Sequence, residues 1–136
     1  MQVSLDTNFG YYLIHKYDDQ GFTLLVPPQL ADESASKQQT ISHHLVLGLD
    51  YYRRWPVDSF EQLGSEHFDE ILQAKPEVVL LGCGQITRFP KQEVLAPFYR
   101  LGIGVEMMST AAACRTFNIL SAEGRQVIAA MLLASS

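Results

Sequence analysis

Two short stretches of the chain carry the side chains best suited to chemistry. The first is Gly82-Cys83-Gly84, directly after an apolar run over 78–81, and the second is 109–118, with one arginine, one asparagine and three hydroxyl side chains. Glycines let a backbone approach a ligand closely, and an arginine can hold a carboxylate or phosphate through two parallel hydrogen bonds. We therefore predict a ligand-binding site made of Gly82, Cys83, Gly84, Ser109, Thr110, Arg115, Thr116 and Asn118.

The second stretch predicts a helix that Ser109 or Thr110 caps, and whose free first amides could receive an anion. At 100° per residue, its core side carries Ala113, Thr116, Phe117 and Leu120, and its outward side carries Ala111, Cys114, Arg115 and Asn118. We expect the outward set to face a ligand. A structural alternative stays open, in which Arg115 pairs with Glu106 or Glu123 and Asn118 caps the last turn of the helix.

Cys83 is the candidate nucleophile of an enzymatic alternative. A cysteine nucleophile needs a nearby base that favours its thiolate. Four histidines could serve, although sequence spacing places none of them beside it: His15, His43, His44 and His67. The adjacent His43 and His44 fall in a predicted strand, where their rings point to opposite faces, so no metal site is predicted. The catalytic residues of such an enzyme stay unknown.

Gly82-Cys83-Gly84 lies at the carboxyl end of a predicted buried strand, where open α/β sheets usually place their ligand. It is not a dinucleotide fingerprint, because the third glycine is missing, and no Gly-Lys-Ser/Thr follows it as in a P-loop. We predict no cofactor.

Charge favours an anionic ligand or an acidic protein partner over nucleic acid. The 136 residues carry a net charge of −5, which opposes nonspecific binding to a phosphate backbone. Residues 1–83 contribute −7, whereas residues 84–118 contribute +2. The predicted site therefore falls in the locally positive third of an acidic chain, although a solvated helix face explains the same count.

The composition is that of a soluble globular protein of one domain, over 1–136, with 47% hydrophobic residues. No apolar run reaches 18 residues, so no transmembrane segment is predicted. The first ten residues resemble neither a signal peptide nor a transit peptide, and two cysteines are too few for a disulfide framework. We expect a cytoplasmic protein with free thiols, and the sequence predicts no particular oligomeric state.

The order of predicted elements is three strands followed by an α-β-α-β-α-α segment. Strands are predicted over 11–16, 22–26, 40–47, 78–81 and 103–107, with a hairpin turn at 18–21 and an exposed loop over 32–39. Helices are predicted to begin at Ser65, Pro90, Ser109 or Thr110, and Ser121. Pro97 should kink or split the second helix. The last helix should pack Val127, Ile128, Met131 and Leu132 inward.

An aromatic and basic cluster occupies 51–56, with two tyrosines, two arginines, Trp55 and Pro56. Rings beside arginines could stack on nucleobases, but the acidic surroundings favour a wall of the core covered by arginine stems. Together these features predict an α/β fold in a single domain. A central mixed sheet carries helices, and the first half adds an antiparallel portion.

The motifs 80–84 and 106–120, followed by Glu123-Gly124-Arg125, resemble the Mth-type domain-of-unknown-function family, to which the mitochondrial respiratory complex I assembly factor 3 belongs. The resemblance covers nearly the whole chain. The family pattern has Met-Asp-Thr where this chain reads Met108-Ser109-Thr110, and usually Tyr at Phe117. It therefore lacks the carboxylate that the family has at the helix start, although Ser109 can still cap.

The resemblance implies a compact three-layer fold around a central mixed sheet. It also implies that mitochondrial relatives assist the assembly of a respiratory complex, whereas the bacterial members lack an established activity. Without a transit peptide, the chain is expected to be a bacterial, cytoplasmic member. Our leading hypothesis is a binding module for a protein partner or a small anionic ligand, in a setting of respiratory assembly. The alternative is a small enzyme that uses the same cleft.

Overall fold

The computed structural model describes residues 10–31 and 37–134, and it contains two β-sheets and three α-helices in this part of the chain. The first sheet is antiparallel, in the order β1-β2-β3, and comprises β1 (Leu13–Asp18), β2 (Gly21–Leu25) and β3 (Gln38–Ile41). The predicted first two strands and their hairpin turn are thus confirmed. Residues 32–36 of the predicted loop lie outside the described residues, and Gln38 and Gln39 belong to β3.

The second sheet is mixed and has the order β5-β4-β8-β6-β7. Its strands are β4 (Leu45–Leu47), β5 (Tyr52–Arg54), β6 (Val78–Gly82), β7 (Gly104–Met108) and β8 (Val127–Met131). Strand β6 runs parallel to both β7 and β8, whereas β4 is antiparallel to β5 and β8. The uninterrupted apolar sequence of β6 fits this central place, because helices cover both faces of the sheet.

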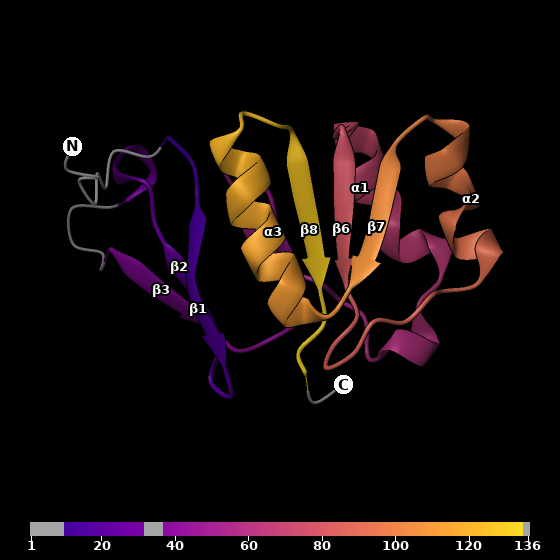
Figure 1. The fold of residues 1–136 in the computed structure, drawn as a ribbon, viewed down its shortest axis with the longest axis horizontal. Coiled ribbons are helices and arrows are strands. Elements are labelled where there is room, and N and C mark those ends of the chain that lie inside the picture. Colours follow the sequence, from indigo (N-terminus) through magenta and orange to yellow (C-terminus); the bar gives the residue numbers. More distant parts are fainter. Residues whose placement is uncertain (1–9, 32–36, 135–136) are drawn as a thin grey trace.

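Helix α3 (Thr110–Ala122) lies between the two sheets, and α1 (Asp69–Ala74) and α2 (Gln92–Arg100) cover the opposite face of the larger sheet (Figure 1). Three short 3₁₀ turns occupy Pro28–Leu30, Phe60–Gln62 and Ser65–Phe68. Successive strand residues supply the two cores alternately: Val78 and Leu80 face α3, whereas Val79 and Leu81 face α1 and α2. The predicted three layers, mixed sheet and additional antiparallel portion are confirmed.

The predicted last helix is wrong. Helix α3 continues through Ser121 and ends where Gly124 adopts a φ of 80°, and the apolar run that follows is β8 in the middle of the larger sheet. A short run that is buried on every side has no polar face, so its periodicity cannot separate a strand from a helix. Its five fully enclosed residues fit between β4 and β6.

The predicted strand over 40–47 is also wrong in one respect, because it is two strands in different sheets. Thr40 and Ile41 end β3, Ser42–His44 form a connection, and Leu45 starts β4. His43 and His44 therefore do not alternate across a strand. Both line one pocket instead.

The boundaries of the first two helices also differ from the prediction. Ser65 lies within a 3₁₀ turn, where Gly64 takes the cap position and donates its N–H to His67 Nδ1 at 2.9 Å. Helix α2 begins at Gln92 rather than at Pro90, and it stays one helix with Pro97 inside. A single proline removes one backbone donor, and the buried Val94, Leu95 and Phe98 hold the short helix on the sheet.

The cluster at 51–56 forms a wall of the core, as predicted. Trp55 is fully buried, donates its ring N–H to the carbonyl of His67 at 3.0 Å, and packs edge-on against Phe68. Arg53 pairs with Glu70 at 3.0 Å on the surface. No helix in the described residues combines the length and the apolar character that crossing a membrane requires.

Candidate functional site

The predicted site residues fall into two groups, and the first group forms a junction inside the molecule. At this junction the carboxyl ends of β6, β7 and β8 meet the start of α3. The backbone of Cys83 donates to the carbonyl of Met108 at 2.8 Å, and the backbone of Leu132 donates to the carbonyl of Gly82 at 2.9 Å. These bonds extend the parallel ladder past the ends of the strands.

Thr110 is the centre of this junction and is fully buried. Its hydroxyl accepts a hydrogen bond from the backbone of Gly84 at 2.9 Å and donates one to the carbonyl of Leu132. Its backbone N–H donates to the carbonyl of Gly84 at 2.8 Å. All of its polar groups at this point are therefore satisfied within the fold, and none is turned to a ligand.

The two glycines of the junction are required by packing and backbone conformation. Gly84 has a φ of 95°, which side chains oppose, and this conformation turns its N–H and carbonyl toward Thr110. A Cβ on Gly82 would lie 3.0 Å from Met131 Cγ and 3.1 Å from Thr110 Oγ1. Ser109 caps α3 by accepting a hydrogen bond from the backbone of Ala112 at 3.2 Å, as predicted.

Cys83 is fully buried, and its thiol faces the carbonyls of Arg88 and Leu81 at 3.3 and 3.5 Å. Burial raises the pKa of this thiol, although neighbouring hydrogen bonds and Arg88 act in the opposite direction. A thiol that stays protonated and enclosed is a poor nucleophile. The structure thus offers no support for the enzymatic alternative that uses Cys83.

The second group lies on the outward side of α3, where the prediction needs one correction. Cys114 is buried, 3.8 Å from the sulfur of Met131, and burial raises the pKa of its thiol to about 12. The expected outward position was wrong because α3 packs against both sheets, which widens its buried stripe to include this residue. Arg115 is exposed, whereas Thr116 is half-buried and lines none of the pockets described below.

Asn118 binds the backbone of β1. Its Oδ1 accepts a hydrogen bond from the N–H of Ile14 at 2.9 Å, and its Nδ2 donates to the carbonyl of Ile14 at 2.8 Å. The side chain thus pairs with the strand as a neighbouring strand would. Asn118 does not cap the last turn of α3, which corrects the structural alternative.

A pocket of about 240 Å³ lies between β1 and α3 and contains Arg115 and Asn118. Lys16 and Arg115 bring positive charge to it from two different elements, and the exposed His15 of β1 also lines it. Lys16 Nζ is 3.6 Å from the carboxylate of Asp18. Arg115 pairs with neither Glu106 nor Glu123, nor with any other acid among residues 10–31 and 37–134. The pocket, which we call the β1–α3 pocket, is lined by Ile14, His15, Lys16, Tyr17, Ala111, Cys114, Arg115 and Asn118.

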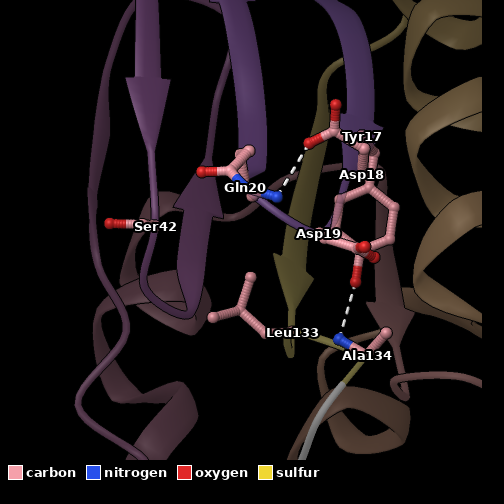
Figure 2. A pocket seen from close by; sticks show the side chains of 8 residues that line it. Tyr17, Asp18, Asp19, Gln20, Ser42, Leu133 and Ala134 are labelled. Carbon is pink, nitrogen blue, oxygen red and sulfur yellow. Dashed lines mark hydrogen bonds between the residues drawn. The ribbon is translucent and has the colours of Figure 1, made fainter.

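Two further pockets were not predicted from the sequence. One, of about 380 Å³, lies beside the β1–β2 hairpin, where the Tyr17 hydroxyl accepts a hydrogen bond from the backbone of Ala134 at 2.6 Å (Figure 2). The other, of about 450 Å³, contains His43, His44, Arg54 and Asp58. Ser42 and Leu133 line both. Their walls come from four distant segments, so no spacing in the sequence could reveal them.

Comparison with known proteins identifies a matching family and several solved structures with a similar fold. Residues 14–132 match the family described as "Protein of unknown function (DUF498/DUF598)". The chain has 33% identity to a Xanthomonas campestris protein solved by NMR, with a TM-score of 0.73, covering 98% of this chain and 93% of that one. It has 25% identity and a TM-score of 0.73 to a Bordetella pertussis protein described as a Mth938-like domain, with the same coverage.

Two relatives carry descriptive names. The chain is 31% identical over 90 residues to the "13 kDa major membrane protein" of Francisella tularensis subsp. holarctica, covering 63% of this chain and 72% of that protein. It is 36% identical over 81 residues to the bovine NADH dehydrogenase [ubiquinone] 1 alpha subcomplex assembly factor 3, covering 58% of this chain and 44% of the factor. The match thus spans less than half of that factor. By its match over 14–132, the chain belongs to the DUF498/DUF598 family of proteins of unknown function, with a Mth938-like fold.

Proposed function

We propose that the chain is a binding module that assists the assembly of a respiratory membrane complex by holding an acidic segment of a partner protein. The observation that carries this proposal is the β1–α3 pocket, where Lys16 and Arg115 face one concave surface and no described acid neutralises Arg115. The assembly role rests on the similarity to the bovine assembly factor. We also propose a cytoplasmic, bacterial setting, with both cysteines as free thiols.

The geometry of the pocket suits a carboxylate. Asn118 fixes β1 against α3, so the backbones that carry Lys16 and Arg115 are held at a constant separation. An arginine that has no internal partner can offer both of its parallel donors to an incoming acid. The buried glycine turn contributes to this arrangement indirectly, because its bonds to Thr110 position the first turn of α3.

The test is complementation in a strain from which the gene for this protein has been deleted. We expect the deletion to lower the amount of assembled NADH dehydrogenase on native gels and the NADH oxidation of isolated membranes. The wild-type gene should restore both, and Arg115→Ala should not. Arg100→Ala is the matched control, because Arg100 is also exposed but lies at the end of α2, away from the pocket.

Two results would count against the proposal in different ways. Unchanged assembly in the deletion strain would remove the assembly role. Full complementation by Arg115→Ala would show that assembly does not need the β1–α3 pocket.

A small anion is the alternative occupant of the pocket, and NMR titration separates it from an acidic protein segment. Phosphate or citrate would shift the signals of His15, Lys16 and Arg115 at concentrations well below the millimolar range if the pocket were built for a free anion. A protein segment predicts weak shifts with these small probes. It also predicts stronger binding of a peptide that holds several aspartates or glutamates.

A further inference from the structure

Strand β7 is an edge of the larger sheet, with β6 on one side and no strand of the described residues on the other (Figure 1). Two bonds fix which of its groups face β6: Gly104 donates to the carbonyl of Glu77 at 3.3 Å, and the carbonyl of Met108 accepts from Cys83 at 2.8 Å. In a parallel pair, alternate residues turn their N–H and carbonyl to the same side. The backbone groups of Val105 and Met107 therefore point away from the sheet.

The side chains of β7 are less enclosed than those of the strands beside it. Every residue of β6 and β8 is buried, whereas Gly104 and Glu106 are exposed on the face that α3 covers elsewhere. Val105 and Met107 pack partly into the core under α2. An added strand would thus find open backbone groups along the edge and a charged side chain, Glu106, on one face.

Apolar side chains bracket this edge. Among the described residues, six large hydrophobic side chains are exposed, and four of them belong to segments at the two ends of β7. Tyr99 and Leu101 are 60% and 56% exposed, at the end of α2 just before β7. Ile86 and Phe89 are 60% and 73% exposed, in the loop that leaves β6 where Cys83 binds the last residue of β7.

The loop that carries Ile86 and Phe89 is held in place by Arg88. The Arg88 guanidinium lies 2.9 Å from the carboxylate of Glu61 and 5.1 Å from the centre of the Phe60 ring, and the Arg88 carbonyl accepts from the buried Cys83 thiol. The apolar side chains on either side of it are therefore presented on a fixed loop. A pre-ordered surface loses little conformational entropy on binding.

We propose that β7 is a docking edge for an extended segment of a partner protein, which adds a strand there and places a basic residue opposite Glu106. Backbone bonds to Val105 and Met107 would give the affinity, and the apolar ends would accept hydrophobic side chains that flank the segment. A second copy of this chain is the less suitable occupant. The antiparallel register with full overlap of two β7 strands sets Glu106 against its own copy, and like charges directly opposite each other are unfavourable. This surface lies outside the β1–α3 pocket, so it stands independently of the proposed function.

The test uses nine-residue peptides of alternating valine and threonine with capped ends, added at millimolar concentration to the ¹⁵N-labelled full chain. One peptide has lysine at its centre and one has glutamate. A third is the lysine peptide with N-methyl groups on the edge that would face β7. We expect the lysine peptide to slow amide exchange at Val105 and Met107, and to bind roughly three- to thirty-fold more tightly than the glutamate peptide. The N-methylated peptide should not bind.

Variants of the chain test the same contact from the other side. Glu106→Lys should reverse the preference between the lysine and glutamate peptides, and Glu123→Lys, with the same change of net charge at the end of α3, should leave it unaltered. Val105→Pro removes an outward donor that the sheet does not use, so it should abolish binding while the spectrum stays folded. If Val105→Pro does not fold, the result for Glu106→Lys tests the proposed contact on its own.

The proposal is overturned if neither peptide protects Val105 and Met107, if N-methylation has no effect, or if Glu106→Lys leaves the preference unchanged. It is also overturned if these amides become protected in the absence of peptide as the protein concentration and the dimer population rise, because the edge would then belong to a second copy. Arg115→Ala should not alter peptide binding. A negative complementation experiment therefore says nothing against peptide binding at β7, and absence of peptide binding says nothing against the assembly role.

Discussion

The junction around Thr110 and the β1–α3 pocket are built from the same helix, and they use polar side chains in opposite ways. At the start of α3, the Thr110 hydroxyl is fully buried and both accepts and donates within the fold. Farther along, Arg115 is exposed and pairs with no acid of the described residues. The two regions show that residue types typical of a binding motif can serve the fold at one end of a helix, whereas along its side we propose that they serve recognition.

The difference follows from where each region lies relative to the sheet. Parallel strands end at the junction, so their last backbone groups need partners, and Thr110 supplies them. The middle of α3 already satisfies its own backbone, so Arg115 is free of that task, whereas Asn118 farther along binds the backbone of β1. Substitutions should therefore affect stability at the junction and binding at the pocket.

The largest loss of stability is expected for Thr110→Val. Valine has the same shape but leaves the N–H of Gly84 and the carbonyl of Leu132 buried without a partner. Two unmet groups should lower the free energy of unfolding by about 2–4 kcal/mol, which urea denaturation measures. Thr116→Val on the same helix is the control, and it should change the value by less than about 0.5 kcal/mol. Equal effects of the two variants would contradict the special role of the junction.

A smaller loss is expected for Asn118→Ala, which belongs to both regions. The side chain lines the pocket, yet its two hydrogen bonds to Ile14 join the hairpin to α3. Their removal from a half-buried site should cost about 1–2 kcal/mol. Hydrogen exchange should show faster opening of the Ile14 amide, while the amides of β6 keep their protection. Unchanged exchange at Ile14 would show that other contacts hold the hairpin.

The sequence predicts the layers and the elements that have a clear signal. The short apolar runs of β1 and β2 with the turn between them, the apolar run of β6 and the Ser109 cap each follow from local chemistry and were confirmed. The strand conformation of 127–131 could not be predicted in this way, because a fully apolar run carries no periodicity. Only its neighbours β4 and β6 make it a strand. Likewise, the separation of 40–47 into two sheets depends on contacts far along the chain.

The residues of the candidate site were predictable from the sequence. Their separation into a buried junction and a surface pocket was not. Helical spacing identified Arg115 and Asn118 as neighbours, which the pocket contains. No local pattern could show that Asn118 binds Ile14, 104 positions away, or that Cys114 is buried by a second sheet. The small residues of the glycine turn indicate a close approach, and here the approaching group is Thr110 rather than a ligand.

Acid should destabilise the fold modestly through His44, which lies in neither region but holds the chain after β8. Its Nδ1 accepts a hydrogen bond from the backbone of Leu133 at 3.0 Å, which requires the neutral ring at that nitrogen. Burial lowers the pKa of His44 from 6.5, although Asp58 opposes this and Arg54 and His43 add to it. Because the unfolded chain takes up this proton more readily, the contribution is present above pH 6.5 and is lost as the pH falls through the folded pKa.

Urea midpoints measured from pH 7.5 to pH 5 should therefore decrease, and His44→Gln should flatten part of the decrease. The effect is expected to be smaller than that of Asn118→Ala, because the ring is half-exposed and solvent screens the charge. An identical pH profile in the variant would assign the acid sensitivity to other groups.

Arg115→Ala should have the smallest effect on stability and thereby sharpen the contrast with Thr110→Val. The side chain is exposed and pairs with no described acid, so its loss should change the free energy of unfolding by less than about 0.5 kcal/mol. Binding of an aspartate-rich peptide should nevertheless fall, because Lys16 alone offers a point charge and no two-bonded fork. Arg115→Lys separates the two causes: a charge-only site would recover most of the affinity, whereas a forked contact would recover little. A clear loss of stability in Arg115→Ala would show that this outward face of α3 serves the fold, as the junction does.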